Sequence, residues 1–224
     1  MQIIVVGRGK LATELLESLN LDFPCRIISW SEKGPTDGKT VIVHAGSGRE
    51  LDEVISYCEE THSTLVELST GSRMRNAGMG FPVVLCPNTN ILMLKFMSML
   101  VTSGHLFSRY RVKLTESHQA QKTSLPGTAV TMAHALGLKA SDVRSVRDPD
   151  EQRSVLQISA EHLDRHAFHQ VVIEDAVCRI TIETRVQGAS PYADGVGQIL
   201  SAIRSNDLED RLYEINEFVE KGWV

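Results

Sequence analysis

The sequence predicts an α/β protein of two domains. The first is a doubly wound parallel sheet, and the second is an α+β domain with a mostly antiparallel or mixed sheet. Two observations support this prediction. In the first ninety residues short apolar runs alternate with helical patterns, which is typical of parallel strands with right-handed crossovers. After Tyr110 consecutive strand patterns are joined by short turns, which favours antiparallel pairing.

The first domain begins with residues 3–6, a β-branched apolar run typical of a strand buried on both faces. Leucines at helical spacing follow between Leu11 and Leu19, and a second helical face runs from Leu51 to Cys58. Further strands are predicted over residues 26–30, 40–44, 64–68 and 81–86. Residues 91–106 are apolar nearly all round, so we expect a buried helix that joins the two domains.

The second domain contains four strand-like segments, at residues 110–115, 155–159, 168–173 and 177–184. The polar residues 141–153 predict mainly a surface loop. Residues 196–203 are helical again, and residues 208–219 predict a closing helix that packs on the first domain. The expected domains are therefore residues 1–90 with 196–224, for dinucleotide binding, and residues 91–195, for substrate binding and oligomerisation.

Composition excludes several classes of function. The chain has 224 residues, a formal net charge of −5 and 42% hydrophobic residues. This charge gives no reason to expect nucleic-acid binding, and no apolar run reaches the roughly 18–20 residues that span a bilayer. The four cysteines are widely spaced, so we expect buried reduced thiols, no metal site and a cytoplasmic location.

A glycine loop follows the first strand. Gly7-x-Gly9-x-x-Ala12 ends a strand and opens a helix, the context that the dinucleotide fingerprint requires. The first glycine permits the turn, the second lets backbone approach the pyrophosphate, and the helix N-terminus attracts the anion. We therefore expect a Rossmann-like domain that binds a dinucleotide, with a plain tight turn as the alternative.

The choice of cofactor depends on the end of the second strand. Glu32 is placed to hold the ribose hydroxyls of NAD, while Ser31, Lys33 and Arg8 could receive the 2′-phosphate of NADP. Each of these residues could equally be part of a solvated turn. The expected cofactor is NADH, NADPH or both.

Two later loops also follow predicted strands. Ser69-Thr70-Gly71 comes after the fourth strand and Pro87-Asn88-Thr89-Asn90 after the fifth. Ligands of open parallel sheets bind at the carboxyl ends of the strands. Both loops are small and polar enough to face a nicotinamide or its ribose, although each could be an ordinary turn.

The segment from Glu116 to Ala129 holds groups that suit an anionic substrate. His118 can exchange a proton near neutral pH, and Lys122 supplies a positive charge. Gly127 and Thr128 open a predicted helix, so they offer backbone N–H groups and a hydroxyl. Singly, a surface lysine and an ordinary histidine would be the safer interpretation, but their shared segment favours a site.

These motifs resemble the 4-hydroxy-tetrahydrodipicolinate (dihydrodipicolinate) reductase family of lysine biosynthesis. That family reads Glu-x-His-His-x-x-Lys-x-x-x-Pro-Ser-Gly-Thr-Ala, and this chain matches its Glu, first His, Lys, Pro and Gly-Thr-Ala. The resemblance extends to five other segments: Gly9-Lys10-Leu11-Ala12, Thr70-Gly71, Pro87-Asn88, Tyr192-Ala193-Asp194-Gly195 and Arg211-Leu212-Tyr213-Glu214.

The resemblance implies NAD(P)H-dependent reduction of the dihydrodipicolinate precursor, a small dicarboxylate, to tetrahydrodipicolinate in lysine and diaminopimelate biosynthesis. His118 would be the catalytic acid/base, and Lys122 a proton donor or carboxylate ligand, with Gly127 and Thr128 binding the second carboxylate. The residues implied for cofactor binding are Gly7, Gly9, Lys10, Leu11, Glu32, Thr70, Gly71, Pro87 and Asn88. The family is commonly tetrameric, so a homo-oligomer is expected.

Two departures from the family pattern motivate alternatives. Gln119 stands where the family has its second histidine, and the turn Pro126-Gly127-Thr128 is one residue shorter. One alternative is a reductase of the same fold that acts on another cyclic imine or enamine carboxylate. Another is a dinucleotide-binding regulator without catalysis, although such a protein would need neither His118 nor Lys122.

Overall fold

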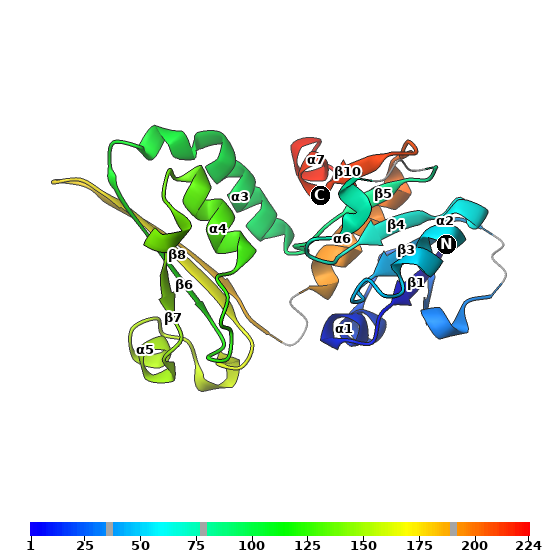
Figure 1. The fold of residues 1–224 in the computed structure, drawn as a ribbon, viewed down its shortest axis with the longest axis horizontal. Helices are drawn as coiled ribbons and strands as arrows, with labels where there is room; N and C mark the ends of the chain where they lie inside the picture. Colours follow the sequence, from blue (N-terminus) through cyan, green and yellow to red (C-terminus); the bar gives the residue numbers. More distant parts are fainter. Residues whose placement is uncertain (35–37, 77–79, 189–191) are drawn as a thin grey trace. The chain divides into compact units, whose positions relative to one another are not determined.

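The computed structural model describes residues 1–34, 38–76, 80–188 and 192–224. The chain divides into two compact units (Figure 1). The first unit comprises Met1–Leu94 and Tyr192–Val224, and the second comprises Lys95–Pro191.

The first unit is built on a parallel sheet of six strands. Their order is β10-β5-β4-β3-β1-β2, and each strand is parallel to its neighbours. The strands are β1 (Gln2–Val6), β2 (Arg26–Ser29), β3 (Thr40–His44), β4 (Thr64–Glu67), β5 (Val83–Leu85) and β10 (Leu212–Glu214). The order reverses between β1 and β3, and ligands of doubly wound sheets bind outside the carboxyl ends of strands at this point. The predicted doubly wound parallel sheet is confirmed.

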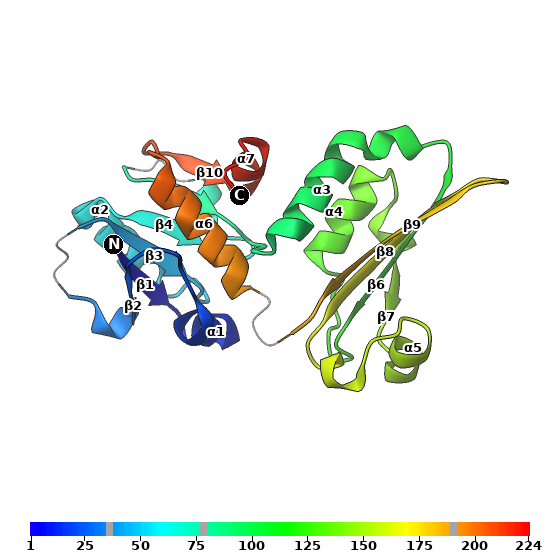
Figure 2. The ribbon, with the colours of Figure 1, turned by 180° about the vertical axis from the view of Figure 1, so that it is seen from behind.

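Helices cover both faces of this sheet (Figures 1 and 2). Ile3 and Val5 of β1 face one way and pack with α1 (Lys10–Ser18) and α6 (Ala193–Ser205). Ile4 and Val6 face the other way and pack with α2 (Leu51–Thr61). Because alternate side chains enter opposite cores, the strands are apolar at nearly every position. The short helices η1 (Trp30–Glu32), η2 (Arg73–Asn76) and α7 (Ile215–Glu220) complete the unit.

Two helix predictions near this unit need correction. Residues 208–219 do not form one closing helix, because Leu212 and Tyr213 pair with β5 as strand β10 before α7 begins. The apolar segment 91–106 forms α3 (Ile91–Ser103) and η3 (Gly104–Phe107), but it is not buried all round. Leu92 is 80% exposed and Val101 is 61% exposed.

The second unit is built on a mixed sheet of order β7-β6-β8-β9. Its strands are β6 (Arg111–His118), β7 (Arg144–Val146), β8 (Ala167–Glu174) and β9 (Arg179–Val186). β7 is parallel to β6, while β6, β8 and β9 are antiparallel neighbours. Its helices are α4 (Gly127–Ala135), α5 (Pro149–Ser154), η4 (Ala140–Asp142) and η5 (Ala160–His162). The predicted α+β architecture with a mostly antiparallel sheet is confirmed.

The polar stretch before β8 differs most from its prediction. Residues 141–153 are not mainly loop, because they include most of η4, all of β7 and most of α5. Asp148 caps α5 by accepting the N–H groups of Asp150 and Glu151, with Pro149 as the first helical residue. Residues 155–159, predicted as a strand, leave the helix as a loop instead. Leu156 and Ile158 are buried there in a small separate core.

Candidate active site

The glycine loop of the first unit needs glycine for two different reasons. Gly7 has φ +132°, and a Cβ built on it would lie 2.6 Å from the carbonyl oxygen of Ala45. A side chain there would collide with the backbone that follows the neighbouring strand, β3. Gly9, the residue that precedes α1, has ordinary extended backbone, and a Cβ on it would meet nothing within 4 Å. Gly7 therefore permits the turn, while Gly9 leaves space above it.

The start of α1 is open to an anion. Gly9 is its N-cap and has no side chain to bond the first N–H groups of the helix. Those groups belong to Lys10 and the residues after it, and they have no acceptor within the helix. Lys10 is exposed and Leu11 is half-buried. A helix start of this kind, beside the point where the strand order reverses, can hold a pyrophosphate.

Glu32 lies after β2, and its carboxylate is partly engaged. Oε2 accepts the N–H of Ser29 at 2.9 Å and the Ser29 hydroxyl at 2.7 Å. These bonds lower the pKa of Glu32, so the exposed carboxylate stays ionised and can accept ribose hydroxyls. Lys33 pairs with Glu53 at 3.1 Å and lies over the Trp30 ring.

The turns after β4 and β5 are fixed by bonds within themselves. The Ser69 N–H donates to Glu67 Oε1 at 2.8 Å, which positions the exposed Thr70 and Gly71. Gly71 has φ +74°, a conformation that favours glycine. Asn88 Oδ1 accepts the N–H of Asn90 at 3.0 Å. Both turns follow carboxyl ends of adjacent parallel strands, so they face the same edge of the sheet as the glycine loop.

A buried histidine–glutamate hydrogen bond below this edge was missed from the sequence. His44 Nδ1 lies 2.7 Å from Glu67 Oε2, and both side chains are completely buried. The two residues end β3 and β4 and stand opposite each other in the parallel register. Polar residues at matching strand ends were the available signal. Glu67 thereby connects His44 to the turn that carries Thr70.

The Tyr192–Gly195 motif also has a structural reason. Glu14 Oε1 accepts the N–H groups of Tyr192 and Ala193, at 2.8 and 3.0 Å, and so caps the start of α6. A Cβ on Gly195 would overlap the carbonyl oxygen of Thr89. The glycine therefore lets α6 pack directly on the turn that contains Pro87 and Asn88.

In the second unit a histidine and a glutamate stand side by side on one strand. Glu116 and His118 are two residues apart on β6, so they share a face of the sheet. His118 Nδ1 lies 2.8 Å from Glu116 Oε2. The Glu116 side chain is completely buried and that of His118 is 14% exposed. The carboxylate can therefore fix one edge of the imidazole, while the ring retains contact with solvent.

Arg147, immediately after β7, completes this pair. Its Nη2 lies 2.6 Å from Glu116 Oε1, and its Nη1 lies 3.2 Å from Oε2. Burial raises the pKa of Glu116, but the bonds from His118 and Arg147 outweigh burial and lower that pKa to about 2. Glu116 is therefore a carboxylate at every working pH. Arg147 was missed because it falls within the stretch predicted as a surface loop.

Two further histidines surround His118. The ring of His169, opposite Glu116 in the sheet register, lies 5.8 Å from that of His118, and the ring of His166 lies 6.5 Å away. Burial lowers the pKa of His169 to about 4, with the charge of His118 adding to the effect. Burial also lowers the pKa of His166. Both rings are held neutral, so they provide a low-polarity wall rather than positive charge.

The end of β6 is anchored by a buried amide. Gln152 Nε2, on α5, donates to Ser117 Oγ at 3.0 Å and to the carbonyl oxygen of His118 at 2.8 Å. Ser117 Oγ also lies 3.0 Å from His166 Nε2. These bonds restrain the backbone that carries His118. They come from a helix that the sequence did not predict.

The remaining predicted residues lie just beyond this strand. Lys122 is half-buried in the turn after β6, and its carbonyl oxygen accepts a bond from Arg147 Nε at 2.9 Å. Gly127 and Thr128 begin α4, whose N-cap Pro126 offers no side-chain bond to their N–H groups. Within the described part of the chain, the Lys122 ammonium and the Thr128 hydroxyl have no hydrogen-bond partner. Both remain available to an anionic ligand.

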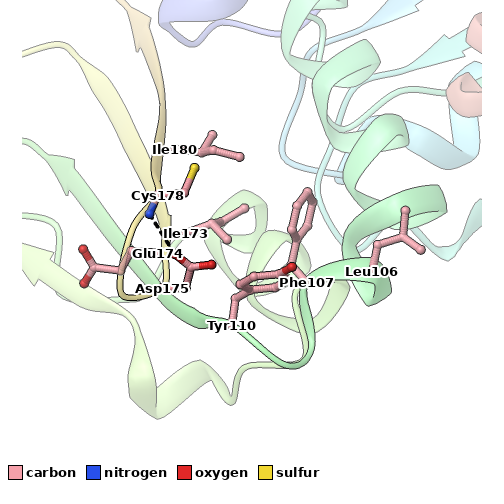
Figure 3. A pocket seen from close by; sticks show the side chains of 8 residues that line it. All are labelled: Leu106, Phe107, Tyr110, Ile173, Glu174, Asp175, Cys178 and Ile180. Atoms are coloured by element: carbon pink, nitrogen blue, oxygen red, sulfur yellow. Dashed lines mark hydrogen bonds between the residues drawn. The ribbon is translucent and has the colours of Figure 1, made fainter.

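A pocket of about 260 Å³ lies elsewhere in the second unit (Figure 3). It lies at the β8–β9 turn, with Glu174 and Ile180 on one side and Phe107 and Tyr110 on the other. Glu174 pairs with Arg111, whereas His118 pairs with Ala167 at the opposite end of β8. The pocket is thus about 20 Å from His118 along the strand. It is separate from the histidine site.

The structure gives no sign of a metal centre in the residues that it describes: no three His, Cys, Asp or Glu side chains are grouped to hold an ion. All four cysteines are free, and burial raises the pKa of Cys58 and Cys86 to about 12. Cys25 is only half-buried and Cys178 is exposed, which corrects the expectation of four buried thiols. No helix among the described residues is long and apolar enough to cross a bilayer.

Comparisons with known proteins show which proteins this chain resembles. A family model described as "Dihydrodipicolinate reductase, C-terminus" matches residues 91–219, more than half of the chain. A probable 4-hydroxy-tetrahydrodipicolinate reductase 1 of Oryza sativa, chloroplastic, is 36% identical over 126 residues. The 4-hydroxy-tetrahydrodipicolinate reductase 2 of Arabidopsis thaliana, chloroplastic, is 32% identical over 127 residues. These alignments cover 52% of this chain, but only 37% and 36% of the relatives.

Solved structures extend the likeness in fold to almost the whole chain. Dipicolinate-bound dihydrodipicolinate reductase from Paenisporosarcina sp. TG-14 superposes with a TM-score of 0.63 and 15% identity, covering 96% of this chain and 98% of that one. A DAP dehydrogenase of C. glutamicum, in complex with DAP, gives a TM-score of 0.52 at 10% identity, with coverages of 97% and 93%. At these identities the superpositions establish the two-unit fold alone.

Proposed function

Because the chain belongs to the dihydrodipicolinate reductase family, we propose that it is an NADH- or NADPH-dependent reductase of an unsaturated cyclic dicarboxylate. The substrate that we propose is the dihydrodipicolinate precursor, with tetrahydrodipicolinate as the product, as in lysine and diaminopimelate biosynthesis. The observation that carries the proposal is the His118–Glu116 pair, which lies in the matched region beside the Lys122 turn. It combines a proton-transfer group with an oriented carboxylate.

The first unit fits a dinucleotide. Gly7 permits the turn before α1, where a side chain would collide with the Ala45 carbonyl oxygen, and Gly9 leaves open space at the helix start. The N–H groups of Lys10 and Leu11 would bind the pyrophosphate. Glu32 would hold the adenosine ribose, and the Thr70-Gly71 and Pro87-Asn88 turns would face the nicotinamide end. When bound, the cofactor supplies a hydride; the remaining steps belong to residues of this chain.

His118 is the proton donor in this proposal. Glu116 takes the Nδ1 hydrogen bond, so Nε2 is the ring atom that delivers a proton to the substrate atom next to the site of reduction. Lys122 binds one substrate carboxylate or assists the proton transfer. The N–H groups of Gly127 and Thr128, with the Thr128 hydroxyl, bind the second carboxylate.

A coupled assay with freshly made dihydrodipicolinate synthase product tests the proposal. NADH and NADPH are supplied in separate reactions, and loss of reduced nicotinamide is followed with and without the product. We expect oxidation that depends on the synthase product with at least one cofactor. Tight cofactor binding without turnover on any imine would instead identify a dinucleotide-binding regulator.

Gln119 favours a second candidate, a reductase of another cyclic imine or enamine carboxylate. Gln119 begins the turn that carries Lys122, and its amide cannot become cationic as a second histidine would. A panel of related cyclic imino acids resolves the two candidates. A tenfold preference for one of them over the dihydrodipicolinate precursor would favour the second.

We also infer that the chain self-associates, as a tetramer, through the second unit. β9 is an edge strand with exposed residues along it, and Ile180 is 43% exposed. Exposed apolar edge strands favour pairing. Light scattering coupled to gel filtration measures the mass directly, and a monomer at micromolar concentration would contradict this inference. The cytoplasmic location stays a prediction from the sequence.

A further inference from the structure

We propose that Arg147 is a positioning residue that fixes His118 and Lys122 together. It does so by holding the Glu116 carboxylate against the His118 ring and by bonding the main chain of the Lys122 turn. This inference rests on the proposed function for its kinetic consequences. Its structural consequence, the tautomer of His118, is independent of any activity.

The guanidinium of Arg147 is used at all three nitrogens. Nη2 and Nη1 bind the two carboxylate oxygens of Glu116, at 2.6 and 3.2 Å. Nε donates to the carbonyl oxygen of Lys122 at 2.9 Å, and Nη1 also donates to the carbonyl oxygen of Val146 at 3.0 Å. A planar fork of fixed donors suits this arrangement, whereas an ammonium group does not.

The bond to Glu116 determines where the His118 proton sits. An ionised carboxylate only accepts hydrogen bonds, so His118 Nδ1 must carry the hydrogen in the 2.8 Å contact with Oε2. Nε2 is then the atom that gains and loses a proton. Without Arg147, the buried Glu116 would lose its counter-charge. Burial would then favour the neutral carboxyl, which can donate its own hydrogen to Nδ1, and the ring could carry its hydrogen on Nε2 instead.

The bond to Lys122 fixes the distance between the two proposed catalytic residues. The turn that follows β6 has one internal backbone bond, from the Lys122 N–H to the Gln119 carbonyl oxygen at 3.0 Å. Arg147 adds a bond from a different strand connection, 25 residues further along the chain. The guanidinium of Arg147 thus holds both the Glu116–His118 pair and the Lys122 turn in place. Small displacements of catalytic groups cost large factors in rate.

The described residues place four titratable groups around His118. Glu116 lies on its own strand, Arg147 follows β7, and His166 and His169 lie before and on β8. The two histidines are held neutral by burial. Glu116 and Arg147 are therefore the fixed charges beside His118, and removing Arg147 leaves its carboxylate partner uncompensated.

The test compares Arg147→Met and Arg147→Lys with the control Arg144→Met in the full-length protein. Arg144 also pairs with a glutamate, Glu151, but its side chain is 59% exposed and is hydrogen-bonded to Glu151 rather than to Glu116 or the Lys122 turn. Nitrogen-15 NMR of the histidine rings, with His118 assigned from a His118→Gln sample, reports the tautomer. Steady-state kinetics over a pH series reports kcat and KM.

We expect wild-type His118 to carry its hydrogen on Nδ1, and Arg147→Met to give a mixture of tautomers. We expect kcat to fall by about 10–100-fold in Arg147→Met, with a shifted pH profile and partial rescue in Arg147→Lys. Arg144→Met should match wild type. If wild-type His118 carries its hydrogen on Nε2, the inference is wrong, even if Arg147→Met fails to fold.

A retained Nδ1 tautomer in folded Arg147→Met would overturn the inference as well. So would a loss of stability with kcat, KM and pH profile unchanged, because Arg147 would then be structural alone. If no substrate is turned over, the proposed function fails while the NMR comparison still decides the role of Arg147.

Discussion

The candidate sites of the two units differ in the groups that form them. In the first unit the candidate site consists mainly of backbone: a turn at Gly7, a helix start after Gly9, and turns at the ends of parallel strands. In the second unit it consists mainly of side chains, with the buried Glu116 and the half-buried Arg147 beside His118. Backbone sites tolerate many side chains around them, whereas the histidine site depends on individual charges and hydrogen bonds. Substitutions in the two units should therefore fail in different ways.

The largest effect is expected at His118. His118→Ala removes the proposed proton donor, so kcat should fall by about 10²–10⁴-fold, equivalent to about 3–5 kcal/mol of transition-state stabilisation. Cofactor affinity, measured by fluorescence titration, should change by less than about twofold, because the site of the first unit does not include this side chain. The exposed His105→Ala is the matched control. Unchanged turnover in His118→Ala would show that the site of the second unit does not depend on this side chain.

The protein should become less stable as pH falls, because of a buried histidine in the second unit. The pKa of His169 is about 4 in the folded protein and 6.5 ordinarily, so between these values the unfolded chain binds the proton and the folded one does not. The free energy of unfolding should therefore decrease by about 3 kcal/mol as pH falls from 6.5 to 4. Below pH 4.5, protonation of unfolded Glu116 adds a further loss as pH approaches 2.

Urea unfolding at a series of pH values measures this slope, and His169→Gln should flatten it between pH 6.5 and 4. An equally steep slope in His169→Gln would show that the titrating group lies elsewhere.

The two glycines of the loop should separate stability from binding. Gly7→Ala places a methyl group 2.6 Å from the Ala45 carbonyl oxygen at a positive φ, so the unfolding free energy should fall by about 2–3 kcal/mol. Gly9→Ala meets no atom within 4 Å, so stability should stay within about 0.5 kcal/mol. Its methyl group would nevertheless occupy the approach to the pyrophosphate and weaken cofactor binding about tenfold.

Thermal melts and cofactor titrations on both glycine variants provide the measurement. Equal losses of stability would contradict the separate roles of the two glycines.

The smallest effect is expected at Lys122. Its ammonium has no partner among the described residues, so Lys122→Met should leave the melting temperature unchanged. KM for a dicarboxylate substrate should rise about 10-fold, or 1–2 kcal/mol, as one charge-assisted contact is lost. Lys139→Met, at an exposed lysine beyond α4, controls for overall charge. A fall in kcat with constant KM would identify Lys122 as a proton donor instead.

The two units were also predictable to different degrees. The strands of the first unit and its glycine loop follow from runs of a few residues, because a buried parallel strand is apolar throughout. Strand β10 was missed because its pairing with β5 lies more than a hundred residues away in sequence. In the second unit His118, Lys122 and the Gly127-Thr128 turn could be predicted as site residues, since one short segment contains them all.

The partners of that segment were hidden for a physical reason. Arg147 and Gln152 lie in a polar stretch whose strand has three residues and whose helix has six, too short to show a period. Their polar side chains face inward, where Glu116 and the carbonyl oxygen of His118 accept their hydrogen bonds. A polar stretch normally indicates a surface loop, but here its polar side chains form an internal hydrogen-bond network.

The sequence alone determined what local chain properties control: the parallel sheet, the turn that requires Gly7, and the segment that carries His118 and Lys122. The tertiary structure alone decided which groups surround that histidine. The register of β6 against β8 places His169 opposite Glu116, and β7 places Arg147 against both Glu116 and the Lys122 turn. Strand register and burial arise from contacts between distant segments, so no local pattern encodes them.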